Sequence, residues 1–192
     1  LISTTASTVQ FEDMELAVAI FEAGITYDLK AIASYREVPF NATHSMNNAG
    51  GAAFDYVSIK HIVPKKFRPP KKEQMKLKVN DKVYDLKPEW IKIDPDNDDP
   101  SVEHNIFVEL NDLRDTEIKG IKPGQKVSLE YPMAAVNLSK DDSLITNCEW
   151  TANTYPRGQP IVIREEGKAE TGILPVTHQR IKVMRGKALL AT

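Results

Sequence analysis

The stretch MNNAGGAAFDYVSIKHIVP, residues 46–64, decides the fold. In its second half, aromatic and β-branched side chains alternate along the chain, which is typical of a β-strand. A polar corner rich in asparagine and glycine leads into this run, and Pro64 ends it, because proline has no backbone N–H to offer a neighbouring strand. We therefore interpret the stretch as a strand at the edge of a β-sandwich and not as a catalytic loop.

Size and composition fit one elaborated domain. The chain has 192 residues, of which 41% are hydrophobic and 27% charged, so it can bury a sizeable core. No apolar run approaches the roughly 20 residues that span a bilayer, and we expect no transmembrane segment. The formal net charge of −2 gives no global reason to bind nucleic acid. Cys148 is the single cysteine, so no internal disulfide can form.

Alternating segments separated by turn clusters continue on both sides of the opening stretch. A tight hairpin is predicted around Asn80-Asp81, since both residues tolerate the positive φ of a two-residue turn. Eight or more strands with almost no helix predict an all-β, antiparallel β-sandwich. The expected strands lie at 14–24, where a helix is the alternative, and at 25–35, which is either a strand pair or one bent strand. The others lie at 54–63, 75–86 as the hairpin, 90–93, 105–113, 126–136, 144–155 and 179–191.

The order of these motifs resembles the prokaryotic immunoglobulin-like repeat of envelope and cell-surface proteins. The matching segments are the corner and strand at 48–67, IKPGQKVSLEY at 121–131, and TANTY at 151–155. The resemblance implies an immunoglobulin-like sandwich with an inserted hairpin and extended termini. It also implies a structural, adhesive or spacer role outside the cytoplasm, and the family has no shared catalytic residues.

Two departures from the repeat suggest how the chain is divided. Residues 1–20, which open with a run rich in Ser and Thr, have no place in the pattern, and we interpret them as an N-terminal arm or strand. Residues 21–192 then form the sandwich domain. The segment at about 65–103 is longer than a plain repeat needs, so we interpret it as an insertion.

The sequence carries no signature of an enzyme. The histidines show no metal-ligand spacing and no close pair, so each is interpreted as an isolated polar or core side chain. Gly50-Gly51 lacks the Lys-Ser or Lys-Thr of a phosphate-binding loop, and no serine is flanked by the glycines of a nucleophile elbow. We therefore predict a non-enzymatic protein. The histidines are His44, His61, His104 and His178.

One acidic segment is a candidate metal site. Asp94, Asp96, Asp98 and Asp99 lie within six residues, and the first three match the opening of a calcium loop. An EF-hand fails, because Asp99 replaces the glycine at its sixth position and Asn105 replaces the closing glutamate. Two alternatives remain, a calcium-stiffened loop and a merely solvated one, and no other cofactor is expected.

A basic segment follows the opening strand, with eight lysines and arginines between Lys60 and Lys78 against the single acid Glu73. Such density would bind an anionic polymer, or attract the aspartate loop of a neighbouring subunit head to tail. A solvated loop that guards a sheet edge is the alternative. Only Phe67 lies inside the run, so no stacking platform for nucleic acid is predicted. The candidate interaction residues are Lys65, Lys66, Arg68, Lys71 and Lys72.

Two glycosylation sequons, beginning at Asn41 and Asn137, fall in expected turns or loops. They agree with an extracellular or cell-surface location.

Three functions therefore compete. The first is a structural or adhesive surface module, a subunit of a fibre or envelope layer, which assembles with copies of itself or with neighbouring repeats through strand addition and charged loops. The second is a carbohydrate- or ligand-binding module with a stacking surface of Trp90, Trp150, Tyr131 or Tyr155, which exposure of Trp90 would favour. The third is a spacer or accessory domain of a larger secreted protein.

Overall fold

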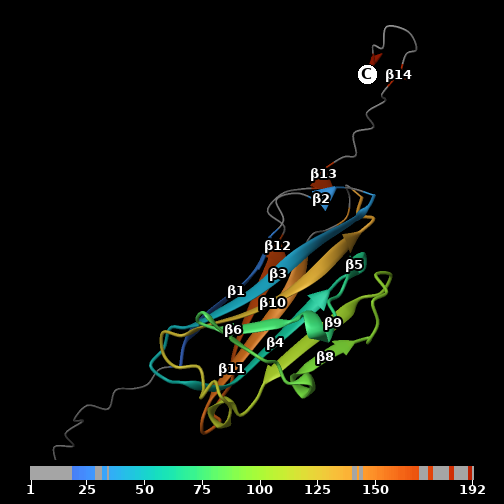
Figure 1. Ribbon diagram of the computed structural model, residues 1–192. Helices are drawn as coiled ribbons and strands as arrows, with labels where there is room; N and C mark the ends of the chain where they lie inside the picture. The colour runs from blue at the N-terminus through green and yellow to red at the C-terminus, as the bar shows by residue number, and fades with distance from the viewer. Residues whose placement is uncertain are drawn as a thin grey trace, which may run out of the picture.

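The protein is a sandwich of two packed antiparallel sheets (Figure 1). The computed structural model describes residues 19–28, 32–33, 35–139, 142 and 145–168, together with short strands at 173–174, 182–183 and 190–191. This all-β architecture confirms the fold class expected from the sequence.

The first sheet is six-stranded and has the order β1-β3-β10-β6-β7, with β5 also paired to β10. Its strands are β1 (Phe21–Tyr27), β3 (Glu37–Asn48), β5 (Phe67–Arg68), β6 (Lys76–Val79), β7 (Lys82–Tyr84) and β10 (Lys126–Val136). The second sheet is five-stranded and has the order β12-β11-β4-β9-β8. Its strands are β4 (Phe54–Val63), β8 (Ile91–Asp94), β9 (His104–Leu110), β11 (Ile145–Thr154) and β12 (Ile161–Lys168).

The remaining elements are short. β2 (Ile32–Ala33) pairs in parallel with β13 (Ile173–Leu174), and β14 (Lys182–Val183) pairs with β15 (Leu190–Ala191). Three 3-10 helices are η1 (Lys72–Gln74), η2 (Pro88–Trp90) and η3 (Leu113–Asp115). No helix among the described residues is long and apolar enough to cross a membrane.

The core lies between the sheets and is built from alternate residues of the long strands, because successive side chains of a strand point to opposite faces. Burial of each large apolar side chain stabilises the fold by about 1.5–3 kcal/mol. At one end, the rings of Phe21 and Phe54 meet edge to face at 5.8 Å and join β1 to β4. The largest fully buried side chains include Trp150, Tyr131, Phe54, Phe67 and Met46.

The described chain enters the sandwich at one pole and leaves it at the other. β1 begins beside Phe54, and β12 begins opposite Ala152 near the same end, so both start at what we call the N-terminal pole. The two strands lie side by side across the edges of the sheets and run in the same direction (Figure 1). β12 ends at Lys168, at the pole where Val63 of β4 pairs with His104. We call this end the C-terminal pole.

Most of the predicted strands are confirmed. The strand at 54–63 has the bounds of β4, and the hairpin turns at Asn80, whose φ is +53°. Its expected position at an edge of the sandwich is wrong, because β4 is the central strand of the second sheet and pairs with β11 and β9. The segment 25–35, expected as a strand pair or as one bent strand, contains the end of β1 at 25–27 and the separate short strand β2 at 32–33. Residues 21–24 of the segment 14–24 lie in β1, as the strand interpretation expected. Residues 14–18, most of the segment 179–191, and residues 1–18 of the predicted arm lie outside the described residues.

Apart from the two-residue strands β5 and β13, two strands were not predicted, and the structural reason is clear for β3, the longest among the described residues. Its inward positions include His44 and Asn48, both fully buried, and the small Ala42, so the strand lacks apolar alternation. The other missed strand is β12. The segment expected as an insertion at about 65–103 contributes β5, β6, β7 and β8, which extend both sheets. The proposed domain boundaries themselves stay a prediction.

The opening corner is held by one buried side chain, which generates a prediction. The Asn48 amide donates to the carbonyls of Ala52 at 2.8 Å and Ile121 at 2.9 Å, and its oxygen accepts the Gly50 N–H at 3.1 Å. The substitution Asn48→Ala should lower the free energy of unfolding in urea by about 2–3 kcal/mol, because buried carbonyls lose their donor. Asn47→Ala, at the next, half-buried position of β3, should cost much less. Equal losses for the two variants would contradict this role of Asn48.

Candidate functional site

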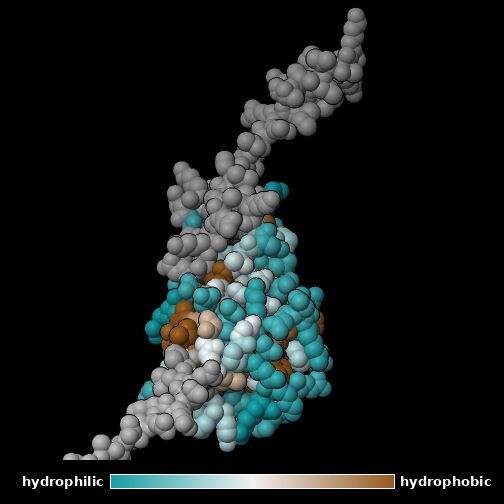
Figure 2. Space-filling view, turned by 90° about the vertical axis from the view of Figure 1, so that its left-hand side faces the viewer, coloured by the Kyte–Doolittle hydropathy of each residue, from teal (hydrophilic) through white to brown (hydrophobic). Residues whose placement is uncertain are grey.

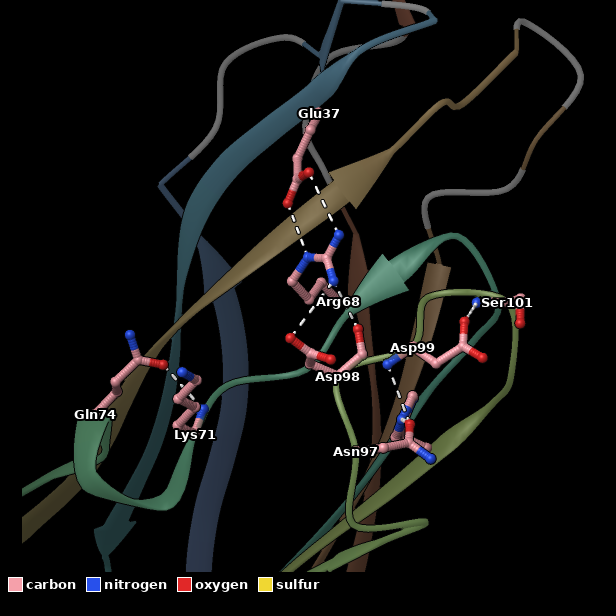
Figure 3. A network of polar contacts seen from close by, with 9 residues as sticks. Glu37, Arg68, Lys71, Gln74, Asn97, Asp98, Asp99 and Ser101 are labelled. Atoms are coloured by element: carbon pink, nitrogen blue, oxygen red, sulfur yellow. Dashed lines mark hydrogen bonds and ion pairs between the residues drawn. The ribbon is translucent and has the colours of Figure 1, made fainter.

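The acidic and basic segments singled out in the sequence meet each other at the C-terminal pole (Figure 3). Arg68 of β5 donates two hydrogen bonds to the carboxylate of Glu37 of β3, from Nε at 2.9 Å and from Nη2 at 3.4 Å. Its Nη1 donates to the backbone carbonyl of Asp98 at 2.7 Å and lies 3.8 Å from the Asp98 carboxylate. The hydrogen bond from Arg68 lowers the pKa of the Glu37 carboxyl. One guanidinium thus ties the aspartate loop to the first sheet.

Two other ion pairs of these segments are also partly exposed. Lys72 lies 3.6 Å from Asp96, and Lys66 pairs with Asp142 at 2.7 Å. Exposed ion pairs of this kind contribute about 0–1 kcal/mol each. Lys65 and Lys71 are exposed at the same pole. A role of these five basic residues in assembly stays a prediction, but part of their charge is already matched within the chain.

The four aspartates have separate partners. Asp94 lies 4.0 Å from Lys92, while Asp99 accepts the Ser101 backbone N–H at 2.8 Å, which lowers the pKa of the Asp99 carboxyl. Among the described residues, no group of three or more His, Cys, Asp or Glu side chains is arranged to hold a metal ion. Calcium binding by Asp94, Asp96, Asp98 and Asp99 therefore stays a prediction that the present loop geometry does not favour.

A buried polar cluster between the sheets escaped the sequence analysis. His44 of β3 and His61 of β4 are both fully buried, with ring centroids 4.8 Å apart. The Tyr131 hydroxyl lies 2.6 Å from Nε2 of His44 and 2.5 Å from Nδ1 of His61. Both histidines are core side chains, which was one of the two interpretations from the sequence, but they are not isolated, because the two rings pack against each other. The register of three strands brings together residues that lie far apart in the sequence.

The ends of this buried polar cluster lie in β1 and β11. Nδ1 of His44 is 3.3 Å from the Cys148 sulfur. Nε2 of His61 is 2.9 Å from the Thr146 hydroxyl and 3.3 Å from the Tyr27 hydroxyl, which also contacts Thr146. The cluster therefore consists of Tyr27, His44, His61, Tyr131, Thr146 and Cys148, and it links both sheets.

The hydrogen bonds of the buried polar cluster are consistent with neutral side chains. Tyr131 has one O–H, so it donates to one imidazole and accepts from the other, which is possible when both rings are uncharged. Burial lowers the pKa of His61 to about 3 and that of His44 well below its ordinary value. Burial also raises the pKa of the Cys148 thiol to about 12, so this cysteine is not an activated nucleophile.

The aromatic residues proposed as a stacking surface are mostly inaccessible. Trp150, Tyr131 and Trp90 are 0%, 1% and 6% exposed, which contradicts a carbohydrate platform built from them. Tyr155 alone remains, at 58% exposed.

Tyr155 belongs to a second exposed feature, at the N-terminal pole. The Arg114 guanidinium carbon lies 3.2 Å from the centroid of the Tyr155 ring, and that of Arg157 lies 5.1 Å from the centroid of Tyr56. We call these four residues the arginine platform. It could not be predicted from the sequence, because its members come from three separate segments: β4, η3 and the turn after β11.

The two sequons differ in their setting. Asn137 is exposed in a bend with φ of +51° just after β10, as expected. Asn41 lies within β3, half-buried, and its amide donates to Asp28 at 2.9 Å, so its expected loop position is wrong. Glycosylation of Asn41 and Asn137 stays a prediction.

Comparison with known proteins identifies relatives by fold only. No protein-family model matches the chain, and no curated protein matches its sequence. The structure is similar to the full-length major pilin SpaD from Corynebacterium diphtheriae, with a TM-score of 0.50 and 13% identity over 76% of this chain. It is also similar to BcpA, the major pilin subunit of Bacillus cereus, with a TM-score of 0.52 and 6% identity over 78% of this chain. The match covers 34% and 39% of those two proteins.

The buried histidines predict acid sensitivity. An unfolded histidine titrates near 6.5, while the pKa of folded His61 is about 3, so between these values only the unfolded chain takes up the proton. The free energy of unfolding therefore has its full value above about pH 6.5. As the pH is lowered below this value, it decreases by up to about 1.4 kcal/mol per pH unit for each histidine. Urea unfolding across this range measures the loss. Imidazole ¹⁵N resonances of the folded chain that titrate near the unfolded value would contradict the prediction.

The separate partners of the aspartates lead to a prediction about calcium. Millimolar calcium should leave the melting temperature within about 1 °C of its value in chelator, because no preformed site binds the ion more tightly in the folded chain. Differential scanning calorimetry with magnesium as control checks this. A calcium-specific rise of several degrees, abolished by Asp96→Asn, would establish the site instead.

Proposed function

We propose that the chain is a non-enzymatic structural module of an extracellular fibre or envelope layer, joined in series with copies of itself or with neighbouring repeats. The observation that carries this proposal is the in-line path of the described chain. It enters at the N-terminal pole with β1 and leaves at the C-terminal pole with β12. A module of this shape extends a series along its own strand axis, because each exit faces the pole where the next module begins.

The pairing of the two terminal strands suits such a role. All seven residues of β1 pair with β3, and all eight residues of β12 pair with β11. Tension applied between the two ends runs along both strands. The force is then parallel to the strands, so all hydrogen bonds between β1 and β3, and all those between β12 and β11, resist it at the same time and not one after another.

The chemistry of the described residues also supports a structural role. The buried polar cluster is neutral and its thiol has a raised pKa. The face drawn in Figure 2 is largely hydrophilic, with hydrophobic patches separate from one another. The likeness in fold to two major pilin subunits agrees with this function.

A spacer domain of a larger secreted protein is the second candidate, because the same in-line path serves a single module within one long chain. A carbohydrate-binding module has less support, since three of its four proposed aromatic residues are buried.

Single-molecule force spectroscopy tests the proposed function. The full chain, held by its two ends within a tandem array, should unfold at high force in one step, because both terminal ladders are sheared. The control attaches the handles at residues 20 and 158, which lie at the same pole, so that the strands separate pairwise. This geometry should give a clearly lower force. Equal forces in the two geometries would contradict a tension-bearing module.

A further inference from the structure

We propose that the arginine platform at the N-terminal pole, formed by Tyr56, Arg114, Tyr155 and Arg157, docks on the aspartate loop of a second copy of the chain. The inference rests on the proposed function, since modules in series bring opposite poles together. It names the surfaces that would meet there.

Each guanidinium group of the platform lies over a tyrosine ring and is paired with a carboxylate only at a distance. Stacking on a ring does not use all the N–H groups of a guanidinium, which can also donate to a carboxylate in its own plane. The nearest carboxylates are Asp115 at 3.8 Å and Asp55 at 3.9 Å from Arg114, and Asp112 at 3.9 Å from Arg157. These distances exceed those of hydrogen bonds, about 2.7–3.2 Å. Neither group therefore has a carboxylate within hydrogen-bonding distance among the described residues.

The loops that present the platform are fixed in place. Asp55 is 5% exposed, and its carboxylate accepts the backbone N–H of Arg114 at 2.7 Å. In the turn after β11, the Asn153 amide donates to the Gly158 carbonyl and accepts the Gly158 N–H, both at 3.0 Å. Residues Tyr155 and Arg157 lie inside this closed turn. A surface ordered before binding loses little conformational entropy when a partner docks.

The aspartate loop has the complementary chemistry and the right location. It follows Asp94, which pairs with Asn105 of β9 at the C-terminal pole. The side chains of Asp96 and Asp98 are 76% and 69% exposed. Their carboxylates lie 3.6 Å and 3.8 Å from Lys72 and Arg68, so both can accept further donors.

The positions of the charged segments exclude a head-to-tail contact between the basic segment of one copy and the aspartate loop of the next. The basic residues from Lys65 to Lys72 lie at the same pole as the aspartate loop, and two of them, Arg68 and Lys72, pair with it within the chain. They cannot supply the other end of a head-to-tail contact. The arginine platform lies at the opposite pole, and a contact between unlike poles repeats without closing, which produces an open fibre.

Charge reversal tests the docking surface. Sedimentation velocity of the full chain at low salt should reveal head-to-tail association that high salt weakens. The double variant Arg114→Glu/Arg157→Glu and the double variant Asp96→Arg/Asp98→Arg should each associate about tenfold or more weakly. An equimolar mixture of the two variants should associate again, because each reversed pole then meets its complement in the other variant. Lys60→Glu/Arg164→Glu, which reverses two charges in the middle of the second sheet and away from both poles, is the control and should associate like the unchanged chain.

Three results would overturn the inference. They are an unchanged chain that stays monomeric at about millimolar concentration, association that survives both reversals, and a mixture of folded variants that does not associate. Circular dichroism confirms that each variant is folded. None of these results bears on the force experiment, so the docking surface can fail while the proposed function stands.

Discussion

The sandwich depends on one shared hydrogen-bonding group, the hydroxyl of Tyr131. It lies in β10 of the first sheet, and it contacts His44 from the same sheet and His61 from the opposite one. Apolar contacts between sheets tolerate sliding, whereas these bonds do not. A shift of one residue in β3, β4 or β10 would turn an imidazole or the phenol to the solvent face and leave its partners unsatisfied. The buried polar cluster therefore fixes the register in which the two sheets face each other.

A fixed register also decides where function can lie. The six residues of the buried polar cluster bond with one another in a neutral arrangement, and the aspartate loop and the arginine platform lie at opposite ends of the strands. At the C-terminal pole, Arg68 draws the aspartate loop onto the first sheet. At the N-terminal pole, tyrosine rings hold two guanidinium groups. Rigid sheets with unlike poles suit a module whose contacts are made end to end.

The sequence predicted those parts of the fold in which local patterning and burial agree. The strands 54–63 and 126–136 carry alternating apolar residues and were found with those bounds. β3 was missed because its inward positions include His44 and Asn48, whose burial depends on partners from other strands. Asn41 was misplaced in a loop for the same reason. The charged loops were correctly expected at the surface. Their contact with each other could not be predicted, because it follows from the sheet order that brings β5 beside the loop after β8.

A structural role in series requires that the described chain runs from one pole of the molecule to the other. The direct measurement is pulse electron paramagnetic resonance on the full chain with spin labels at residues 20 and 168, Cys148 being buried. The length of β12 predicts one narrow distance distribution on the order of 25 Å, since a strand rises about 3.3 Å per residue. A short distance, with both labels at one pole, would contradict the in-line module.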